Sequence, residues 1–312
     1  MKRRDFLGLT TLATGAAVLN PVIRSAQTTT SPIISGEPVE PVWVPLTKEI
    51  KSTRIGFGTG MQGGQRRSDL VRAGYPKAIE LLRYAYDQGI RLFDCADMYG
   101  THDVVAEALR EKPRESYVLV SKIWLRTGGG LPEIERPDPE ISVKRFLREV
   151  KTDYIDVVQI HCITDAHWTA EYADAMRSLE KLKKAGLIRA HGISSHSNAA
   201  TELAAATAWC DVVHVRINSE GLAMDGPRDN PAARVAESAR VAKKAHDAGK
   251  GIIAMKIIGQ GEATMTTDAE LRKKSTKFVV GLDCVDVMIV GFSEKEHITE
   301  FITNVANISA DG

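Results

Sequence analysis

The chain carries almost no excess charge and has no long hydrophobic run. Its 312 residues include 41 Lys and Arg against 40 Asp and Glu, which gives a formal net charge of +1 at pH 7. No basic stripe is interleaved with aromatic side chains, so we expect no nucleic-acid partner. The apolar stretches stop short of the roughly 20 residues that a transmembrane helix needs. We therefore expect no membrane span in the mature chain.

Cysteine is scarce as well. The residues are Cys95, Cys162, Cys210 and Cys284, and their wide spacing contains no C-x-x-C pair. This pattern argues against a disulfide framework and against a zinc site. Most of these cysteines lie in or at the end of apolar runs, so we interpret them as buried thiols. We expect no metal site.

The N-terminus has the pattern of an export signal. A basic start that contains Arg3 and Arg4 precedes an apolar run over residues 7–23, and small residues follow up to Ala26. This arrangement is typical of a secretory signal, and the paired arginines resemble the twin-arginine (Tat) signal. The alternative is an uncleaved membrane anchor, for which the run is short and only mildly apolar. We expect residues 1–26 to be cleaved near Ala26 after export of the folded chain to the periplasm by the Tat machinery.

The remainder divides into a linker and one repetitive domain. Residues 27–53 are rich in Pro, Thr and Ser, so we expect a linker outside the fold. From residue 54 to 312 apolar runs alternate with helical patterns. Strands are predicted over 54–60, 91–95, 117–123, 155–163, 187–193, 212–217, 252–258 and 285–290. Helices are predicted over 76–88, 102–110, 139–151, 169–185, 198–209, 231–248, 268–280 and 295–307.

These units predict an α/β fold of the (β/α)8 TIM-barrel type, preceded by the signal peptide. The strands are continuously apolar, as parallel strands buried on both faces should be. Eight β-α units in about 260 residues match a TIM barrel. The alternative is a doubly wound open sheet with a Gly-rich dinucleotide turn. No G-x-G-x-x-G opens a helix here, because Gly56-x-Gly58-x-Gly60 leads into a polar loop.

Polar residues end three consecutive predicted strands. Asp94 ends the second strand, Lys122 the third and His161 the fourth, while Tyr99 follows in the loop after Asp94. Singly, the Asp and Lys could form a structural ion pair, and the His could be a structural hydrogen-bonding residue. Because barrel chemistry collects at the C-terminal ends of the strands, we predict that all four side chains form one catalytic group.

The chemistry of such a group points to carbonyl reduction. An unperturbed tyrosine has a pKa of about 10, and we expect the Lys122 ammonium, held by Asp94, to lower the pKa of Tyr99. His161 could hydrogen-bond the substrate oxygen beside the Tyr hydroxyl. A site of this kind protonates a carbonyl oxygen as it becomes an alkoxide, which hydride transfer to an aldehyde or ketone requires. The pattern contains no Ser or Cys nucleophile with a base, and no zinc ligand set.

The motifs around these residues resemble the aldo-keto reductase family over about residues 54–300. They are Phe93–Gly100, Lys122 after its strand, Thr152–Asp156 leading to His161, and Lys184–Ser194. The resemblance implies a TIM barrel, a cofactor that is NADPH or NADH, and a small-molecule carbonyl substrate. It also implies a tetrad of Asp94, Tyr99, Lys122 and His161, with Tyr99 as general acid.

The resemblance also implies a cofactor cradle, in which this chain departs from the family pattern. Ser195 stands where the family has Asn beside Ser194, and His214 stands where the family has Gln. Met255 and Lys256 replace the ring that usually stacks on the nicotinamide. The last strand lacks the Lys-Ser…Arg pattern that grips the 2′-phosphate of NADPH. The implied cofactor-binding residues are Gly58, Ser194, Ser195, His214, Met255, Lys256, Gly291, Ser293 and His297.

Two functions follow from these observations. An intact tetrad favours an exported NAD(P)-dependent oxidoreductase that reduces an aldehyde or ketone, or oxidises the alcohol. An altered cradle leaves open a non-catalytic barrel that holds a dinucleotide or binds a partner. Loops 61–75 and 125–138 are the expected substrate walls.

Overall fold

A computed structural model describes residues 38–126, 131, 138–259 and 267–310. The predicted signal over residues 1–26, the linker up to residue 37 and most of the expected substrate wall at 125–138 lie outside the described residues.

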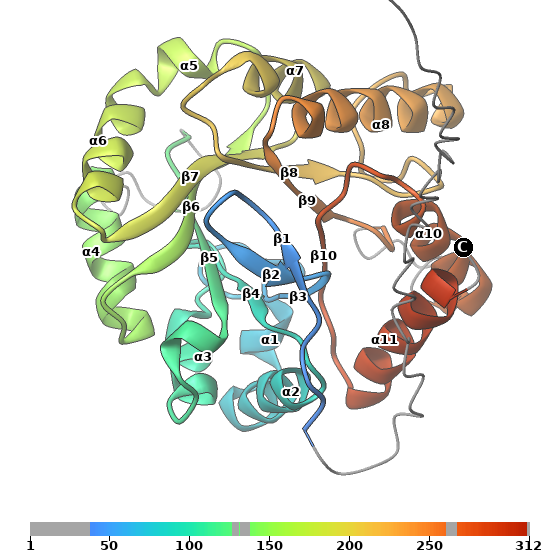
Figure 1. Cartoon of the computed structure of the whole chain (residues 1–312), viewed down its shortest axis with the longest axis horizontal. Coiled ribbons are helices and arrows are strands. Elements are labelled where there is room, and N and C mark those ends of the chain that lie inside the picture. Colours follow the sequence, from blue (N-terminus) through green and yellow to red (C-terminus); the bar gives the residue numbers. More distant parts are fainter. Residues whose placement is uncertain (1–37, 127–130, 132–137, 260–266, 311–312) are drawn as a thin grey trace, which may run out of the picture. The chain divides into compact units, whose positions relative to one another are not determined.

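Eight parallel strands form a closed barrel, which confirms the predicted TIM-barrel fold and excludes the open sheet (Figure 1). Each strand pairs with the next along the chain, and β10 closes the ring by pairing with both β9 and β3. The strands are β3 (Ile55–Gly58), β4 (Leu92–Asp94), β5 (Val118–Ile123), β6 (Ile155–Ile163), β7 (Ile188–Ser195), β8 (Val212–Arg216), β9 (Gly251–Met255) and β10 (Val287–Val290).

Helices surround the barrel and bury their apolar faces against the strands (Figure 1). They are α1 (Asp69–Arg72), α2 (Tyr75–Asp87), α3 (His102–Leu109), α4 (Pro139–Val150), α5 (Trp168–Glu171), α6 (Ala173–Lys184), α7 (Asn198–Ala206), α8 (Pro231–Asp247), α10 (Ala269–Val280) and α11 (Lys295–Ala310), with a 3-10 turn at Arg114–Ser116. Two of these helical regions differ from the prediction. The helix expected over 169–185 is interrupted at Tyr172, whose φ of −106° is not helical, and α1 lies within the expected loop 61–75.

Alternate residues of each strand point into the barrel. Successive side chains of a strand point to opposite faces, and one apolar cluster contains the inward-facing residues. Its members are Leu46, Ile50, Leu92, Val118, Val120, Val157, Ala190, Val212, Ile253, Met255, Val287 and Ile289. Continuing this period of two toward the C-terminal rim reaches the polar residues Asp94, Lys122 and His161. The same alternation therefore gives the barrel an apolar interior and a polar C-terminal rim, the polar mouth.

A hairpin closes the opposite end of the barrel. β1 (Trp43–Pro45) pairs antiparallel with β2 (Lys51–Thr53), and Leu46 and Ile50 between them belong to the interior cluster. The expectation that all of residues 27–53 lies outside the fold is therefore wrong for this hairpin. Two apolar residues in a polar segment are too few to produce a periodic sequence signal, yet both are buried.

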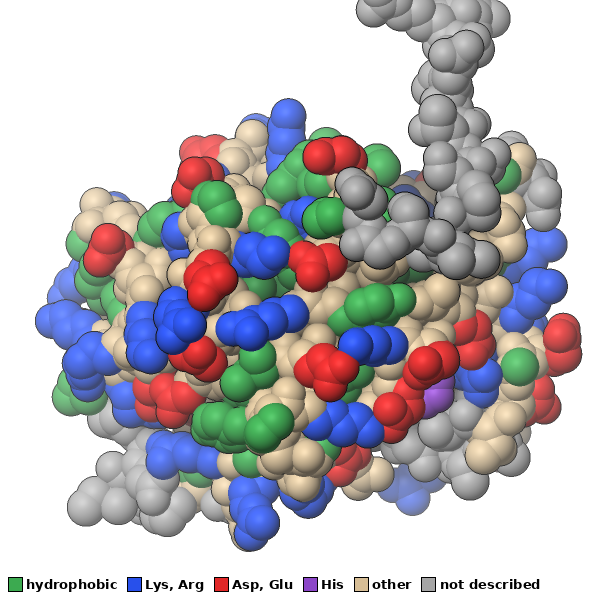
Figure 2. Space-filling model, turned by 90° about the horizontal axis from the view of Figure 1, so that it is seen from below, with side chains coloured by type: hydrophobic (Ala, Val, Ile, Leu, Met, Phe, Trp, Pro, Cys, Tyr) green, Lys and Arg blue, Asp and Glu red, His purple; other side chains and the backbone are tan. Residues whose placement is uncertain are grey.

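The surface is consistent with the balanced composition. On the face shown in Figure 2, Lys and Arg side chains are interspersed with Asp and Glu, and no field of one sign covers it. None of the helices in the described part of the chain is both long enough and apolar enough to span a bilayer.

Candidate active site

A buried ion pair lies at the centre of the polar mouth. Lys122 Nζ donates to Asp94 Oδ1 at 2.5 Å and to the carbonyl oxygen of Cys95 at 3.0 Å. Both charged side chains are at most 2% exposed. Burial opposes ionisation of Asp94, but Lys122 and His214 outweigh it and hold the pKa of that carboxyl below its ordinary value.

His214 stands on the other side of Asp94. Its Nε2 lies 3.2 Å from Asp94 Oδ1, and the side chain is fully buried. Burial lowers the pKa of His214 to about 4, although Asp94 acts in the opposite direction. The imidazole is therefore neutral at pH 7, and the Lys122 ammonium is the cation that balances Asp94.

Two glycines, one just before loop 61–75 and one within it, pack against the ring of Tyr99. A Cβ on Gly60 would lie 2.2 Å from Tyr99 Cζ, and one on Gly63 would lie 2.6 Å from Tyr99 Cδ1. Real side chains do not approach that closely, so the ring packs directly on the glycine backbone. The Tyr99 hydroxyl lies 3.4 Å from His161 Nε2, and Lys122 Nζ lies 5.1 Å from the ring centre.

The expectation that the pKa of Tyr99 is lowered is wrong. Burial, followed by the negative charges of Asp94 and Asp97, raises the pKa of Tyr99 well above its ordinary value. The expectation considered the Lys122 ammonium but not the burial of the phenol, which is the largest cause of the raised pKa. Tyr99 is therefore a neutral phenol that holds its proton at pH 7.

Asp97, which the sequence analysis did not single out, lies near His161. Asp97 Oδ1 lies 3.9 Å from His161 Nδ1, and Asp97 Oδ2 accepts a 2.7 Å hydrogen bond from the Trp124 backbone nitrogen. The rings of Tyr99 and Trp124 pack edge-on against His161, with ring centres 5.5 and 5.4 Å away. Burial lowers the pKa of His161, with Asp97 opposing the shift, so the imidazole is neutral.

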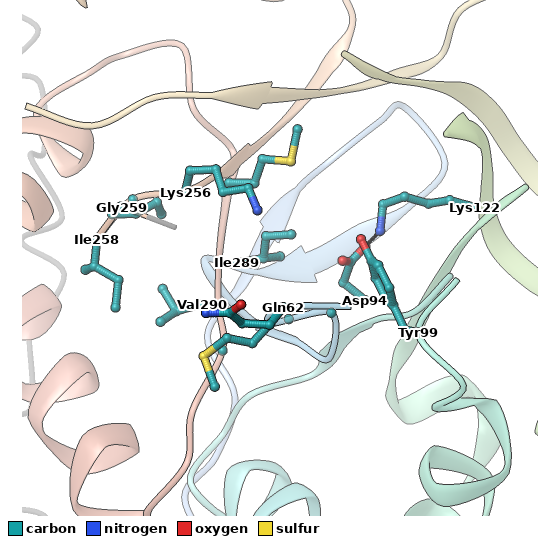
Figure 3. A pocket seen from close by; sticks show the side chains of 15 residues that line it. Gln62, Asp94, Tyr99, Lys122, Lys256, Ile258, Gly259, Ile289 and Val290 are labelled. Atoms are coloured by element: carbon teal, nitrogen blue, oxygen red, sulfur yellow. Dashed lines mark hydrogen bonds and ion pairs between the residues drawn. The ribbon is translucent and has the colours of Figure 1, made fainter. Parts of the chain in front are cut away.

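Four of the predicted cofactor-binding residues line a groove beside this group (Figure 3). They are Gly58, Met255, Lys256 and Gly291. Asp94, Tyr99 and Lys122 line the same groove, and Lys256 extends over it toward them in Figure 3. The groove runs between the ends of β3, β9 and β10, so a molecule bound in it would reach the tetrad.

Two more predicted residues present unsatisfied polar atoms in the barrel mouth. Ser194 pairs with His214 in the register of β7 and β8. Both are buried and neither lines the groove, and Ser194 Oγ and His214 Nδ1 have no hydrogen-bond partner in the structure. Buried polar groups normally find partners, so this position fits a bound amide that can both donate and accept. The residues present are therefore compatible with a nicotinamide carboxamide.

The remaining predicted cofactor residues are not brought to the groove. Ser195 Oγ donates to the carbonyl oxygen of Ser197 and receives a bond from Thr201, so it faces α7. Ser293 and His297 are hydrogen-bonded to each other at 3.2 Å in an exposed position at the start of α11. Ser293 and His297 do not line the groove beside the tetrad. Among the described residues, no cluster of three or more His, Cys, Asp or Glu could hold a metal ion.

Comparison with known proteins identifies a common family. The sequence model of the Aldo/keto reductase family matches residues 54–309. Aldo-keto reductase family 1 member C21 of Rattus norvegicus is 32% identical over 163 residues, 45% of this chain and 47% of that protein. Methylglyoxal reductase DkgB of Salmonella typhi is 30% identical over 156 residues, 49% of this chain and 52% of that protein. The chain spans about half the length of the curated relatives it matches.

The fold also recurs among solved structures. A protein from Pseudomonas aeruginosa assigned to the aldo-keto reductases superposes with a TM-score of 0.69 at 24% identity. The superposition covers 88% of this chain and 98% of that one. At this identity the likeness establishes the fold.

Proposed function

The chain belongs to the Aldo/keto reductase family, and from that premise we propose that it is an NAD(P)-dependent oxidoreductase that reduces an aldehyde or ketone. The same site would oxidise the corresponding alcohol in reverse. The observation that carries the proposal is the neutral Tyr99 phenol, 3.4 Å from His161 and beside the buried Lys122–Asp94 pair, at the mouth of the barrel.

Tyr99 acts as the proton donor in this proposal. A carbonyl oxygen that gains negative charge needs a proton, and a bound nicotinamide dinucleotide would supply the hydride. The raised pKa of Tyr99 keeps the phenol protonated until that charge develops. After the proton leaves, the Lys122 ammonium near the ring stabilises the tyrosinate. Neutral His161 hydrogen-bonds to the phenol and orients it.

The groove residues would hold the dinucleotide. Gly58 and Gly291 allow close approach of a ligand to the strand ends. Ser194 and His214 would hydrogen-bond the carboxamide through the atoms that have no partner in the structure.

The direct test follows nicotinamide absorbance at about 340 nm. Purified protein is mixed with NADPH or NADH and a panel of small aldehydes and ketones. One relative is named a methylglyoxal reductase, so methylglyoxal heads the panel. Loss of absorbance that depends on the carbonyl compound supports the proposal. Tight dinucleotide binding without any turnover would instead favour the non-catalytic barrel.

We predict that the protein distinguishes NADPH from NADH only weakly. The described start of α11 offers Ser293 and His297, which bond to each other, and Lys295, which pairs with Glu80 at 2.5 Å. No arginine stands there to grip a 2′-phosphate bidentately. Fluorescence titration should give dissociation constants that differ by less than about a hundredfold, or roughly 2.7 kcal/mol. NADPH binding that is tighter by more than this would contradict the prediction.

We also propose that the chain is exported folded and carries its dinucleotide to the periplasm. The proposal rests on Arg3 and Arg4 in the N-terminal pattern. Replacing both with Lys should leave the protein in the cytoplasm, as cell fractionation would show. Native mass spectrometry of the exported wild type should detect a bound dinucleotide. Cytoplasmic retention of the wild type with residues 1–26 uncleaved would contradict export, and exported protein that is always empty would contradict the carried cofactor.

A further inference from the structure

Two cationic side chains face the mouth of the barrel beside the tetrad. Arg216 is the last residue of β8, and it pairs in register with Met255, which precedes Lys256. Arg216 lies two residues beyond inward-facing His214, so the alternation along β8 brings it to the rim. Lys256 has a φ of +62°, which non-Gly residues seldom adopt. Its side chain extends over the groove (Figure 3).

The guanidinium of Arg216 has neutral partners. Nη2 donates to His196 Nδ1 at 2.5 Å and Nη1 donates to the carbonyl oxygen of Ala223 at 3.1 Å. Nε is buried without a hydrogen-bond partner. Asp225 is the acid whose charge acts on Arg216, and its Oδ2 accepts from the Asn198 backbone nitrogen.

The charge of Lys256 is likewise not balanced locally. Burial lowers the pKa of Lys256 to about 8, and the positive charges of Arg216 and Lys122 add to the shift. Asp94 and Cys162 act in the opposite direction but are outweighed. His196 contributes no charge, because burial and Arg216 lower its pKa to about 2. Two like charges kept close together inside a protein cost free energy unless an anion joins them.

His196 connects Arg216 to the strand that carries His161. Cys162 follows His161 directly, and its Sγ lies 3.0 Å from His196 Nδ1, the atom that Arg216 also contacts. Arg216 is absent from the lining of the dinucleotide groove, whereas Lys256 belongs to it. An anion between the two cations would therefore lie at the border of the groove and the space next to His161.

We propose that Arg216 and Lys256 bind an anionic group of the carbonyl substrate, and that the preferred substrates are aldehydes or ketones that carry a carboxylate. This inference rests on the proposed reductase function and names its substrate class. A guanidinium matches a carboxylate in shape and can donate two parallel hydrogen bonds. A phosphate of the dinucleotide shares this anionic chemistry, so the experiment must separate the two sources.

The first experiment compares an anionic aldehyde with its neutral ester, and follows how each variant changes the ratio of the two. We expect a larger kcat/KM for 4-carboxybenzaldehyde than for its methyl ester, and Arg216→Gln should reduce the ratio of the two at least about tenfold. Arg216→Lys should retain part of the preference. Arg177→Gln is the matched control, because Arg177 lies exposed on α6 beside Asp174, and it should leave the ratio unchanged. An unchanged ratio in folded Arg216→Gln would overturn the proposal.

The second experiment needs no turnover. Benzoate binding to the dinucleotide-free protein, to which the pKa of Lys256 applies, is measured by calorimetry from about pH 6.5 to 9.5. Lys256 is charged below its pKa of about 8, so binding should be strong at the acidic end and weaken as the pH rises through that value. Lys256→Met should remove this pH dependence. If Lys256→Met weakens NADPH binding but leaves benzoate binding intact, the cation serves a dinucleotide phosphate and the proposal fails. Benzoate binding with the expected pH dependence, but without turnover of any carbonyl, would support the anion site while refuting the reductase.

Discussion

Tyr99→Phe is expected to lower kcat for carbonyl reduction by about 10²- to 10⁴-fold. The substitution removes one oxygen, which is the only proton donor within 3.4 Å of His161 Nε2 that the described hydrogen bonds include. The ring itself can stay, because the contacts with Gly60 and Gly63 involve its carbon atoms. Dinucleotide binding should therefore change little. Steady-state kinetics with a saturating carbonyl substrate, together with dinucleotide titration, measure both effects.

Tyr84→Phe is the matched control. Tyr84 lies on α2 outside the barrel, and its hydroxyl contacts Thr299 Oγ1 at 2.8 Å. Removing that oxygen should leave kcat within the error of the wild type. Near-normal turnover in Tyr99→Phe would remove Tyr99 from the chemistry and leave it a positioning residue.

The raised pKa of Tyr99 also predicts a pH dependence for reduction. A phenol whose pKa lies well above its ordinary value stays protonated throughout the neutral range. The rate of reduction should therefore not fall through loss of the Tyr99 proton near pH 7 to 9. A decline in that range would come from other groups, and Lys256 is the side chain beside the groove whose pKa, about 8, lies there.

The fold and the tetrad could be predicted because both depend on periodicity. Continuous apolar strands that alternate with amphipathic helices require a parallel barrel, and residues at successive strand ends must meet at one rim. Arg216 follows from the same rule, since it lies two residues beyond His214. It was missed because His214 was the one residue of the strand over 212–217 to which a role was assigned.

Other features depend on distances that no periodicity supplies. The sign of the Tyr99 pKa shift depends on how deeply the phenol is buried and on the nearby carboxylates of Asp94 and Asp97. Ser195 was assigned to the cofactor by its position in a motif, but β7 alternates, and the residue after inward-facing Ser194 must face the helices. Asp97 lies in a loop, where no periodicity predicts that its carboxylate lies 3.9 Å from His161 Nδ1.

Lys122→Met is expected to reduce both turnover and stability. The substitution leaves Asp94, which is 2% exposed, as a buried carboxylate without its ammonium partner. Breaking a buried pair in this way costs about 3–5 kcal/mol. Turnover should fall because no cation remains to stabilise the Tyr99 anion. Chemical denaturation and steady-state kinetics measure the two losses separately.

The pH dependence of the stability loss identifies its cause. In the wild type, Lys122 holds the pKa of Asp94 below its ordinary value against the effect of burial. Without Lys122, burial dominates and the folded-state pKa rises above that of the unfolded chain. The variant should therefore show its full stability loss at pH 7 and recover relative to the wild type as the pH falls, because its Asp94 gains a proton at a higher pH than the wild-type carboxyl does.

A double variant separates the effect of the ion pair on stability from the effect of the Lys122 ammonium on turnover. Asp94→Asn combined with Lys122→Met removes the uncompensated carboxylate, so much of the lost stability should return at pH 7. Activity should not return, because the ammonium beside the Tyr99 ring is still missing. If the double variant regained both stability and turnover, Lys122 would serve only to neutralise Asp94, and stabilisation of the Tyr99 anion would have to come from another group at the rim.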